Sequence, residues 1–284
     1  DRLKKIVMNK TTPKGRSERE IAGYRDVLNT VHENYDYIPI RPGMILQLHR
    51  DLYKFSNTSI GGSFKSSDNG IAEELPDGTK RVRFQPVPAW ETPEAMHALC
   101  NALREALADP ELDPLLLIPM FVLDFLCILP VNDGNGRMSR LLTLLLLYRS
   151  GYFVGKYISI ERLIADSKGT YYEALQESSA GWHEGHNDYL PFVRYMLGIV
   201  VAACREFAAR VDTLVTKGVS KPDRVRKIIR NATGRVTKTQ IRTQCPDISQ
   251  KTVERALAGM LKNGEILKIG GGRYTSYAWN WEKE

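Results

Sequence analysis

The segment from Asp113 to Ile128 places the strongest constraint on the fold, because nearly every residue in it is apolar. The longest apolar stretch runs from Leu115 to Val131, is interrupted by Pro119, Asp124 and Pro130, and is too short for a comfortable membrane span. A helix without a polar side must be covered by other elements all round. We therefore expect this helix at the centre of a core, surrounded by further helices.

Helical periodicity dominates the chain up to about residue 216 and predicts a mainly α-helical body. Ser17 and Glu20 have the spacing of a capping box, so we expect a helix from Ser17 to Tyr35. Periodicity and first-turn proline residues predict the other helices at Pro42–Phe55, Thr92–Ala108, Gly136–Ser150, Ser159–Ser178 and Asn187–Thr216.

Residues 61–90 lack the helical periodicity of the rest of this region. Asp77-Gly78 separates two short extended runs in this region, and an Asp-Gly pair between such runs is typical of a tight β-hairpin turn. We expect a β-hairpin flap laid over the helical body.

The composition is that of a soluble globular protein, with 43% hydrophobic and 26% charged residues, which excludes disordered and fibrous classes. The four cysteines lack CxxC spacing and the five histidines lack HExxH spacing, which argues against a disulfide framework and a zinc site. No signal peptide or membrane-spanning segment is visible. We expect a cytoplasmic protein with free thiols and no membrane partner.

Positive charge is concentrated at the C-terminal end. Residues 220–284 hold 14 Lys and Arg against 6 Asp and Glu, a net charge of +8, whereas the remaining 26 bases and 27 acids give −1. Such a compact basic segment indicates an anionic partner, nucleic acid first. A solvated surface without a partner is the alternative.

The pattern of this segment predicts a winged helix-turn-helix over residues 223–284, after a linker at 217–222. Three short helices are expected at Asp223–Asn231, Thr237–Thr243 and Gln250–Lys262, followed by a hairpin within 264–277. The third helix would be the recognition helix, and a protein-docking module is the alternative. The exposed face of that helix should carry Gln250, Lys251, Glu254 and Arg255. The candidate DNA contacts are Gln250, Lys251 and Arg255 on this face, and Lys268 and Arg273 on the wing.

Residues 129–140 carry the strongest chemical signal. Gly134-Asn135-Gly136 places unhindered backbone amides at the start of a helix, where free N–H groups and the helix dipole bind phosphate. Arg137 and Arg140 lie three residues apart on one helix face, which suits a di- or triphosphate. Asp133, just before the glycines, is well placed to hold Mg²⁺. The alternative is a glycine-rich turn with an aspartate cap and solvated arginines.

This stretch resembles the Fic family signature, His-Pro-Phe-x-Asp/Glu-Gly-Asn-Gly-Arg-x-x-Arg, in ten of its twelve positions. The resemblance extends over roughly Arg19 to Tyr195 and includes the flap. It implies a helical Fic core over residues 1–216 with a β-hairpin flap, here followed by the small winged helix. Most members of the family are protein adenylyltransferases, which transfer AMP from ATP to a Ser, Thr or Tyr hydroxyl of a target protein.

The resemblance also implies roles for individual residues. Asp133 would hold Mg²⁺, Gly134, Asn135 and Gly136 would bind the transferred phosphate, Arg137 would bind the outer phosphates and Arg140 the terminal one. Tyr171 or Tyr172 would line the adenine pocket, with ordinary helix packing as the alternative. The flap residues Asp68, Asn69, Gly70 and Ile71 would hold the target as an added strand.

The family's catalytic histidine, which takes the proton from the attacking hydroxyl, aligns with Leu129. Leucine accepts no proton, and loss of a general base typically slows a reaction by a factor of about 10²–10⁴. We expect binding of ATP and Mg²⁺ to survive and transfer, to another protein or to the chain itself, to be impaired. The chain is either a natural member without the base or an altered form of an active one. His183 and His186 follow a different helix and are expected to be structural.

Two other functions stay open. The chain could be a nucleotide-binding, DNA-binding regulator without transferase activity, or its winged helix could be a docking scaffold for protein partners.

Overall fold

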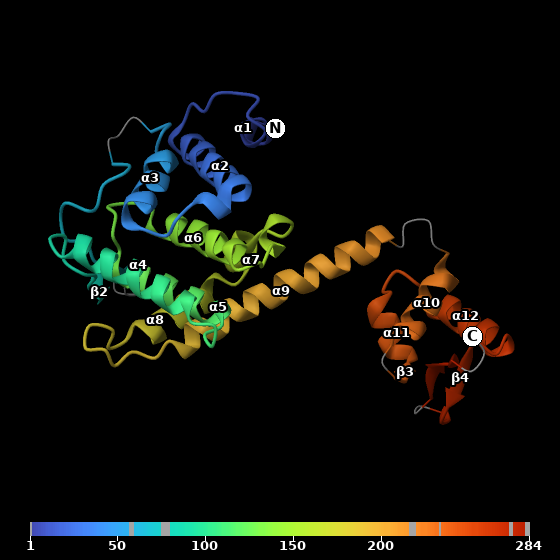
Figure 1. The fold of residues 1–284 in the computed structure, drawn as a ribbon. Helices are drawn as coiled ribbons and strands as arrows, with labels where there is room; N and C mark the ends of the chain where they lie inside the picture. The colour runs from blue at the N-terminus through green and yellow to red at the C-terminus, as the bar shows by residue number, and fades with distance from the viewer. Residues whose placement is uncertain are drawn as a thin grey trace. The chain divides into compact units, whose positions relative to one another are not determined.

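The computed structural model describes residues 2–56, 60–74, 80–215, 220–232, 234–272 and 275–281. The chain divides into two compact units, Asp1–Phe207 and Ala208–Glu284, with the division inside helix α9 (Leu190–Val215) (Figure 1). The turn predicted at Asp77-Gly78, residues 217–219 of the predicted linker and Arg273 lie outside the described residues.

Two consecutive helices, α5 (Pro114–Ile128) and α6 (Asn135–Arg149), form the centre of the first unit and pack against each other. Asp113 caps α5 by accepting a hydrogen bond of 2.8 Å from the amide of Leu115. Nine residues of α5 and eleven of α6 are buried. Each fully buried Leu, Ile or Phe stabilises the fold by about 1.5–3 kcal/mol. The predicted central helix is therefore confirmed.

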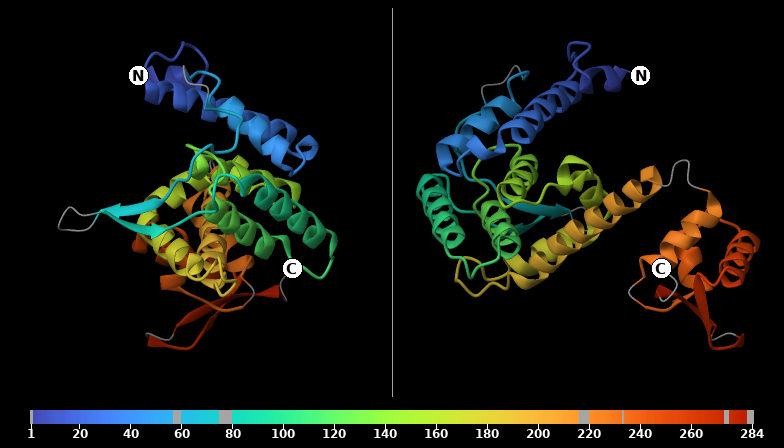
Figure 2. Two further views of the ribbon diagram at one scale, coloured as in Figure 1. Left: turned by 90° about the vertical axis from the view of Figure 1, so that its left-hand side faces the viewer. Right: turned by 45° about the vertical axis from the view of Figure 1, so that its right-hand side comes forward.

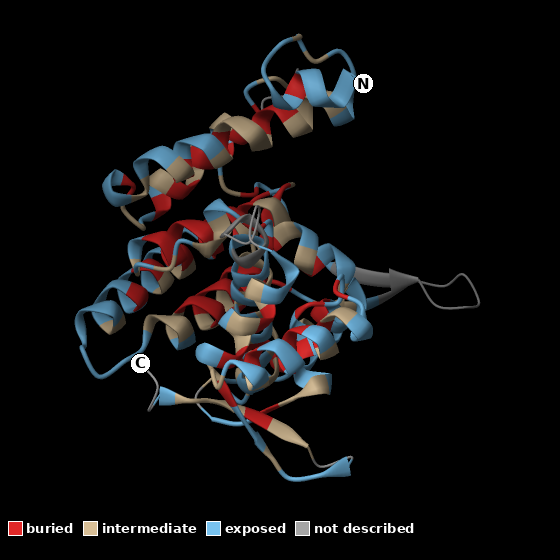
Figure 3. Cartoon of the chain, turned by 90° about the vertical axis from the view of Figure 1, so that its right-hand side faces the viewer, coloured by how far each residue is buried: buried red, intermediate tan, exposed pale blue. Residues whose placement is uncertain are grey.

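Other helices cover this pair, and the buried residues gather on their inward faces (Figures 2 and 3). α4 (Thr92–Ala108) and α8 (Lys168–Ser179) pack on α5, whereas α2 (Arg16–Asn34) packs on α6 and on α3 (Pro42–Leu52). The contact between α2 and α3 is very close at Gly23, where an added Cβ would lie 2.0 Å from the carbonyl oxygen of Leu52.

The start of α2 corrects one prediction. The helix begins at Arg16 with Gly15 as its N-cap, and no side chain caps it, so Ser17 lies inside the helix and the predicted capping box does not form. Glu20, the expected partner in that box, instead accepts a hydrogen bond from Arg16.

The predicted helix at 159–178 is two helices, α7 (Ile160–Asp166) and α8. The break is at Ser167, whose hydroxyl donates to the carbonyl of Leu163 and lies 2.8 Å from the hydroxyl of Tyr195. A short N-terminal helix, α1 (Arg2–Val7), and the 3-10 turns η1 (Tyr35–Tyr37) and η2 (Val154–Lys156) were not predicted.

The flap consists of strands β1 (Ile71–Glu74) and β2 (Lys80–Phe84), which pair antiparallel and project from the helices (Figure 2). Its base is fixed to the helical body at two points. Arg83 donates a hydrogen bond of 3.2 Å to the carbonyl of Tyr172. His183 donates one of 2.7 Å to the carbonyl that follows β2, and its ring stacks on the last residue of that strand.

Beyond the end of α9, the described residues of the second unit form three helices and a three-stranded antiparallel sheet of order β3-β5-β4. Along the chain its elements are α10 (Lys221–Arg230), β3 (Val236–Thr237), α11 (Lys238–Gln244), α12 (Gln250–Lys262), β4 (Ile266–Ile269) and β5 (Ser276–Trp279). Its own core includes Val225, Ile229, Ile241, Val253, Leu257 and Met260. β3 was not predicted.

Two caps set the helix boundaries in this unit. Thr237 and Gln240 form a capping box at the start of α11. The hydroxyl of Ser220 caps α10, and Pro222 occupies its first turn, so Lys221 and Pro222 belong to this helix rather than to the predicted linker.

All four cysteines are free, and Cys100, Cys127 and Cys245 are buried. In the described part of the chain, no helix combines the length and the apolar character that crossing a bilayer requires.

Asp124 is the charged residue within the apolar helix α5, and it ties the connection between α8 and α9 to that helix. Its Oδ1 accepts hydrogen bonds from Trp182 Nε1 at 2.7 Å and from the Tyr189 hydroxyl at 2.9 Å. Burial raises the pKa of Asp124, although both hydrogen bonds oppose the rise.

We predict that Asp124→Asn becomes more stable than the parent as the pH rises from about 3 to 7. The asparagine amide keeps Oδ1 as the acceptor of both hydrogen bonds. In the parent, the pKa of Asp124 is raised above its unfolded value of about 3.9, so the folded protein loses stability as the pH rises through this raised pKa. Asp124→Leu leaves both donors unpaired and should cost about 1–3 kcal/mol for each. Urea unfolding across this pH range measures both effects.

Asp188→Asn is the matched control, because Asp188 is an exposed aspartate that caps the start of α9 and asparagine caps a helix equally well. A pH-independent difference between Asp124→Asn and the parent would contradict the prediction.

Candidate functional site

The loop between α5 and α6 begins at Leu129, the position of the predicted missing base. Leu129 adopts left-handed backbone angles (φ 51°, ψ 62°), and its amide bonds to the carbonyl of Phe125 at 3.0 Å. This conformation costs a residue with a Cβ about 1–2 kcal/mol. Position 129 is thus the turn at which the chain leaves the central helix.

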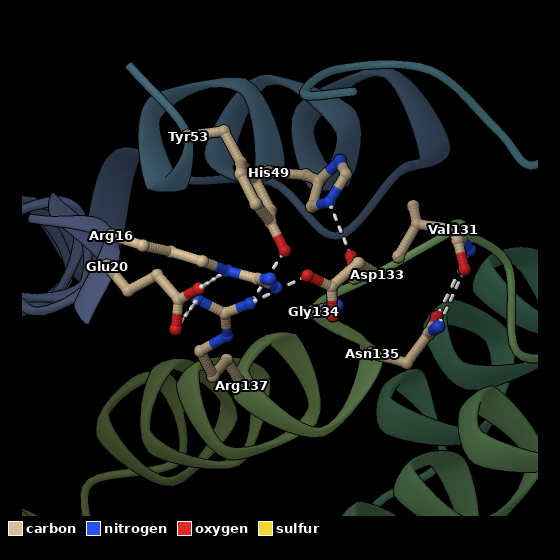
Figure 4. Close-up of polar contacts among 9 residues, drawn as sticks. All are labelled: Arg16, Glu20, His49, Tyr53, Val131, Asp133, Gly134, Asn135 and Arg137. Carbon is tan, nitrogen blue, oxygen red and sulfur yellow. Dashed lines mark hydrogen bonds and ion pairs between the residues drawn. The ribbon is translucent and has the colours of Figure 1, made fainter. Parts of the chain in front are cut away.

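Asn135 closes the loop on itself. Its side-chain oxygen accepts a hydrogen bond of 3.1 Å from the amide of Val131, and its side-chain nitrogen donates one of 2.7 Å to the carbonyl of the same residue (Figure 4). Asn135 is buried, so neither backbone group of Val131 has water as a substitute. The side chain holds the loop against the first turn of α6.

Gly134 is required by its position in two ways. Its φ of 91° is in the left-handed region, and an added Cβ would lie 3.0 Å from the hydroxyl oxygen of Tyr53. The carbonyl of Gly134 accepts the first helical bond, from Met138. The amides of Asn135, Gly136 and Arg137 therefore have no partner within α6 and mark the predicted anion site.

Asp133 is held as a carboxylate beside these amides. Its Oδ1 accepts a hydrogen bond of 2.7 Å from the amide of Gly134, and its Oδ2 lies 3.3 Å from Arg137 Nη2. Burial raises the pKa of Asp133, but the hydrogen bond from Tyr53 and the charge of Arg137 outweigh it and hold the pKa below the ordinary value. The side chain is 46% exposed and can reach a ligand.

Arg137 contacts Glu20 of α2, Tyr53 at the end of α3 and Asp133 of the loop before α6 (Figure 4). Its Nη2 donates to the Tyr53 hydroxyl at 2.6 Å and to Asp133, and its guanidinium lies 5.1 Å from the centre of the Tyr53 ring. Its Nη1 lies 3.5 Å from Glu20 Oε2 of α2 but makes no hydrogen bond and is buried. The side chain is fixed while one donor stays unsatisfied.

Arg140 has a different environment. It is half-buried, its charge acts on Tyr171 and Tyr24, and burial raises the pKa of Tyr171 to about 12 although Arg140 opposes the rise. Tyr24 donates a hydrogen bond of 2.6 Å to Glu161. Among the residues that the structure describes, no carboxylate forms an ion pair with Arg140.

His49 and Tyr53 were missed by the sequence analysis. His49 is fully buried; its Nε2 donates a hydrogen bond of 2.9 Å to the carbonyl of Asp133, and its Nδ1 accepts one of 3.1 Å from Gly62. Burial lowers the pKa of His49. Because both ring nitrogens are engaged, His49 offers no free base. The available signal was the spacing of four residues, which places both rings on one face of α3.

Lys65 ties the start of the flap to the end of α5. Its buried Nζ donates hydrogen bonds of 3.0 Å to the carbonyl of Ile128 and to Asn69 Oδ1, and its amide bonds to the carbonyl of Pro130. Burial lowers the pKa of Lys65. A lysine that follows Gly-Gly-Ser-Phe gave no sequence signal for this role.

Of the flap residues predicted to hold a target, two have side chains engaged within the flap. Asp68 accepts a hydrogen bond of 2.7 Å from the amide of Ala89, and Asn69 accepts the one from Lys65. Gly70 is exposed, and Ile71 is the first residue of β1.

The two tyrosines predicted at an adenine pocket differ in exposure. Tyr171 is buried and packs against Phe192 and Tyr195. Tyr172 is 45% exposed, with Lys168 Nζ 5.9 Å from its ring centre. Of the two, Tyr172 is the one at the surface.

In the second unit, α12 presents the expected faces. Val253 and Leu257 are buried and Leu261 is partly buried, whereas Gln250, Lys251 and Arg255 are exposed, as is Lys268 on β4. Glu254 pairs with Lys238 at 3.2 Å, and Gln250 accepts a hydrogen bond from Arg242. Lys238 and Arg242 belong to α11 and add to the positive charge beside α12.

No group of three or more His, Cys, Asp or Glu suited to a metal ion occurs in the described ranges. Asp133 by itself fits Mg²⁺, since this ion is commonly held by one or two carboxylates together with phosphate oxygens of the substrate.

Residues 37–147 match the model of the Fic/DOC family. The chain is 26% identical over 196 residues to a protein adenylyltransferase Fic from Aedes aegypti, covering 68% of this chain and 33% of that protein. It is 28% identical over 165 residues to a protein adenylyltransferase Fic from Nematostella vectensis, covering 57% and 31%. The chain thus spans about a third of the length of these relatives.

Solved structures share the fold. A Fic family protein from Desulfovibrio desulfuricans superposes with a TM-score of 0.57 at 21% identity, covering 98% of this chain and 80% of that one. A Fic domain containing signaling protein from Bacteroides thetaiotaomicron gives 0.58 at 22% identity, covering 71% and 76%. The mainly α-helical Fic fold predicted for the chain is confirmed.

We predict that Asn135→Ala destabilises the first unit by about 1–3 kcal/mol, because it leaves buried backbone groups of Val131 unpaired. Asn132→Ala is the matched control, since Asn132 lies in the same loop and is exposed. Urea unfolding of both variants gives the difference, and equal losses would contradict the role assigned to Asn135.

Proposed function

We propose that this chain, whose residues 37–147 form a Fic/DOC domain, is an ATP-binding protein adenylyltransferase with impaired chemistry. The observation that carries the proposal is the ionised Asp133 beside the free first-turn amides of α6, with Arg140 not neutralised by a described carboxylate. The names of the two relatives support the same activity.

In the proposed complex, Asp133 holds Mg²⁺, which would neutralise charge on the nucleotide phosphates. The amides of Asn135 and Gly136, freed by the turn at Gly134, bind the phosphate that is transferred. Arg137 and Arg140 bind the outer phosphates through their guanidinium groups. Tyr172 is the tyrosine available to line the adenine pocket.

Transfer forms a bond between the oxygen of the target's hydroxyl and the α-phosphorus, and it breaks the bond from that phosphorus to the β-phosphate oxygen. Pyrophosphate leaves with the electron pair of the broken bond. The hydroxyl proton needs an acceptor, but Leu129 has none and both nitrogens of His49 are engaged. The proton therefore goes to water, which makes transfer slow. The target, or the chain itself, presents its hydroxyl along the flap at residues 68–71.

We predict that Leu129→His raises transfer of label from ATP to protein by a factor of about 10²–10⁴, the usual contribution of a general base. The assay compares radiolabelled ATP and UTP with the parent and the variant. Leu129→Gln, which is polar but not basic, is the control and should stay at the parent's level. Equal labelling by the parent and Leu129→His would show that another group supplies the base.

A second function is favoured by the charge of residues 220–284. We propose that this unit is a winged helix-turn-helix that binds DNA, with α12 as the recognition helix. Its net charge of +8 and the exposed Lys251 and Arg255 support this reading, together with the nearby bases Lys238 and Arg242. DNA binding and nucleotide binding can coexist in one chain, and as a regulator the protein would need no transfer activity.

For this function we predict that the full chain binds duplex DNA with an affinity that falls steeply with salt, by a log–log slope of about −0.9 per neutralised phosphate. Lys251→Gln with Arg255→Gln should weaken binding and reduce the slope by about two phosphates. Lys262→Gln, in the last turn of α12, is the control. No binding at low salt would instead favour the protein-docking function.

A further inference from the structure

A pocket of about 320 Å³ opens between α2, α3 and the loop that carries Asp133. Its volume is at the small end for ligand pockets and suits part of a nucleotide rather than a whole one. Its polar lining comes from Arg16, Arg19, Glu20, Tyr53, Ser56 and Asp133. Arg16, Arg19 and Glu20 lie on α2, outside the segment that matches the Fic/DOC family.

Glu20 bridges two arginines at this pocket. Its Oε1 accepts a hydrogen bond of 2.9 Å from Arg16 Nε, and its Oε2 lies 3.5 Å from Arg137 Nη1. Figure 4 shows the guanidinium groups of Arg16 and Arg137 side by side, both directed toward Asp133. The charge of Asp133 also raises the pKa of Arg16, though less than Glu20 does.

The charges around the pocket do not balance. The pocket lining holds two guanidinium groups (Arg16 and Arg19) and two carboxylates (Glu20 and Asp133). Arg137 lies outside the lining but pairs with both carboxylates, and it adds one positive charge in excess. Arg137 Nη1 is buried and lacks an acceptor, so its hydrogen-bonding capacity is unused. An anion with several oxygens would supply both the missing charge and the missing acceptor, and guanidinium groups match phosphate oxygens well.

Asp133 belongs to both the pocket and the anion site, because it lines the pocket and bonds to the amide of Gly134. A phosphate chain whose first phosphate lies on the amides of α6 can therefore pass Asp133 and enter the pocket. Its outer phosphates would then meet Arg16 and Arg137, where the negative charge of a leaving pyrophosphate develops.

We propose that Arg16, assisted by Arg19, is a ligand of the outer phosphates of a nucleoside triphosphate and of the pyrophosphate that is released. This inference rests on the proposed nucleotide-binding function and adds a pyrophosphate subsite formed by α2.

The test is calorimetry of the full chain with three probes, inorganic pyrophosphate, ATP and AMP, each with Mg²⁺. In Arg16→Gln, binding of pyrophosphate and ATP should weaken by about five- to tenfold, as for a partly exposed charge-assisted contact, and further in the double variant with Arg19→Gln. Binding of AMP should change less than about twofold, because AMP has no outer phosphates. Arg104→Gln, an exposed arginine of α4 outside the pocket, controls for net charge.

The outcomes separate this inference from the function on which it rests. If the parent binds pyrophosphate and Arg16→Gln weakens that binding selectively, the subsite stands even if ATP gives no heat, and only the nucleotide function fails. If the parent binds ATP and Arg16→Gln leaves both pyrophosphate and ATP unchanged, the inference is wrong and the proposed function stands. Equal weakening of AMP, or no pyrophosphate binding by the parent, also overturns the subsite.

Discussion

The packing of α5 against α6 is the interaction on which the rest of the first unit depends. α5 has no polar side to turn toward water, so it is stable only when other helices enclose it. α6 and α4 both provide much of that cover, and α6 is itself mostly buried. The six residues between the two helices are therefore held at both ends by the core. The two helices that anchor this loop cannot shift without exposing apolar surface, so the loop keeps its position.

Hydrogen bonds across the loop fix the positions of its backbone groups. Asn135 holds Val131, His49 holds the carbonyl of Asp133, and Lys65 holds the end of α5. Two of these residues also have bonds in the segment that leads into the flap: His49 accepts from the amide of Gly62, and Lys65 donates to Asn69. The loop and the base of the flap are thus one connected structure, although they are more than sixty residues apart in the chain.

Local signals in the sequence predicted what local interactions decide. Thr92–Ala108 and Gln250–Lys262 were placed with correct bounds, because proline in the first turn and a serine cap start these helices. The break at Ser167 was missed, since it involves a tyrosine 28 residues away. The capping box at Ser17 was wrong, because Glu20 pairs with Arg16 and Arg137 instead. Asp133 and the glycines of the site could be predicted because they belong to one short motif. Arg16, Glu20 and Tyr53 lie 80 residues or more before Asp133 in the chain, and only the fold brings them to the site.

The left-handed backbone at Leu129 has a consequence for how this position can change. Leucine rarely adopts such angles, whereas histidine and asparagine do so several times more often. The hydrogen bond from its amide to Phe125 and the burial of the flanking residues impose the conformation, so the main chain keeps it whichever side chain is present. At this residue activity and stability do not compete: the backbone retains a shape that suits histidine better than the leucine it now carries.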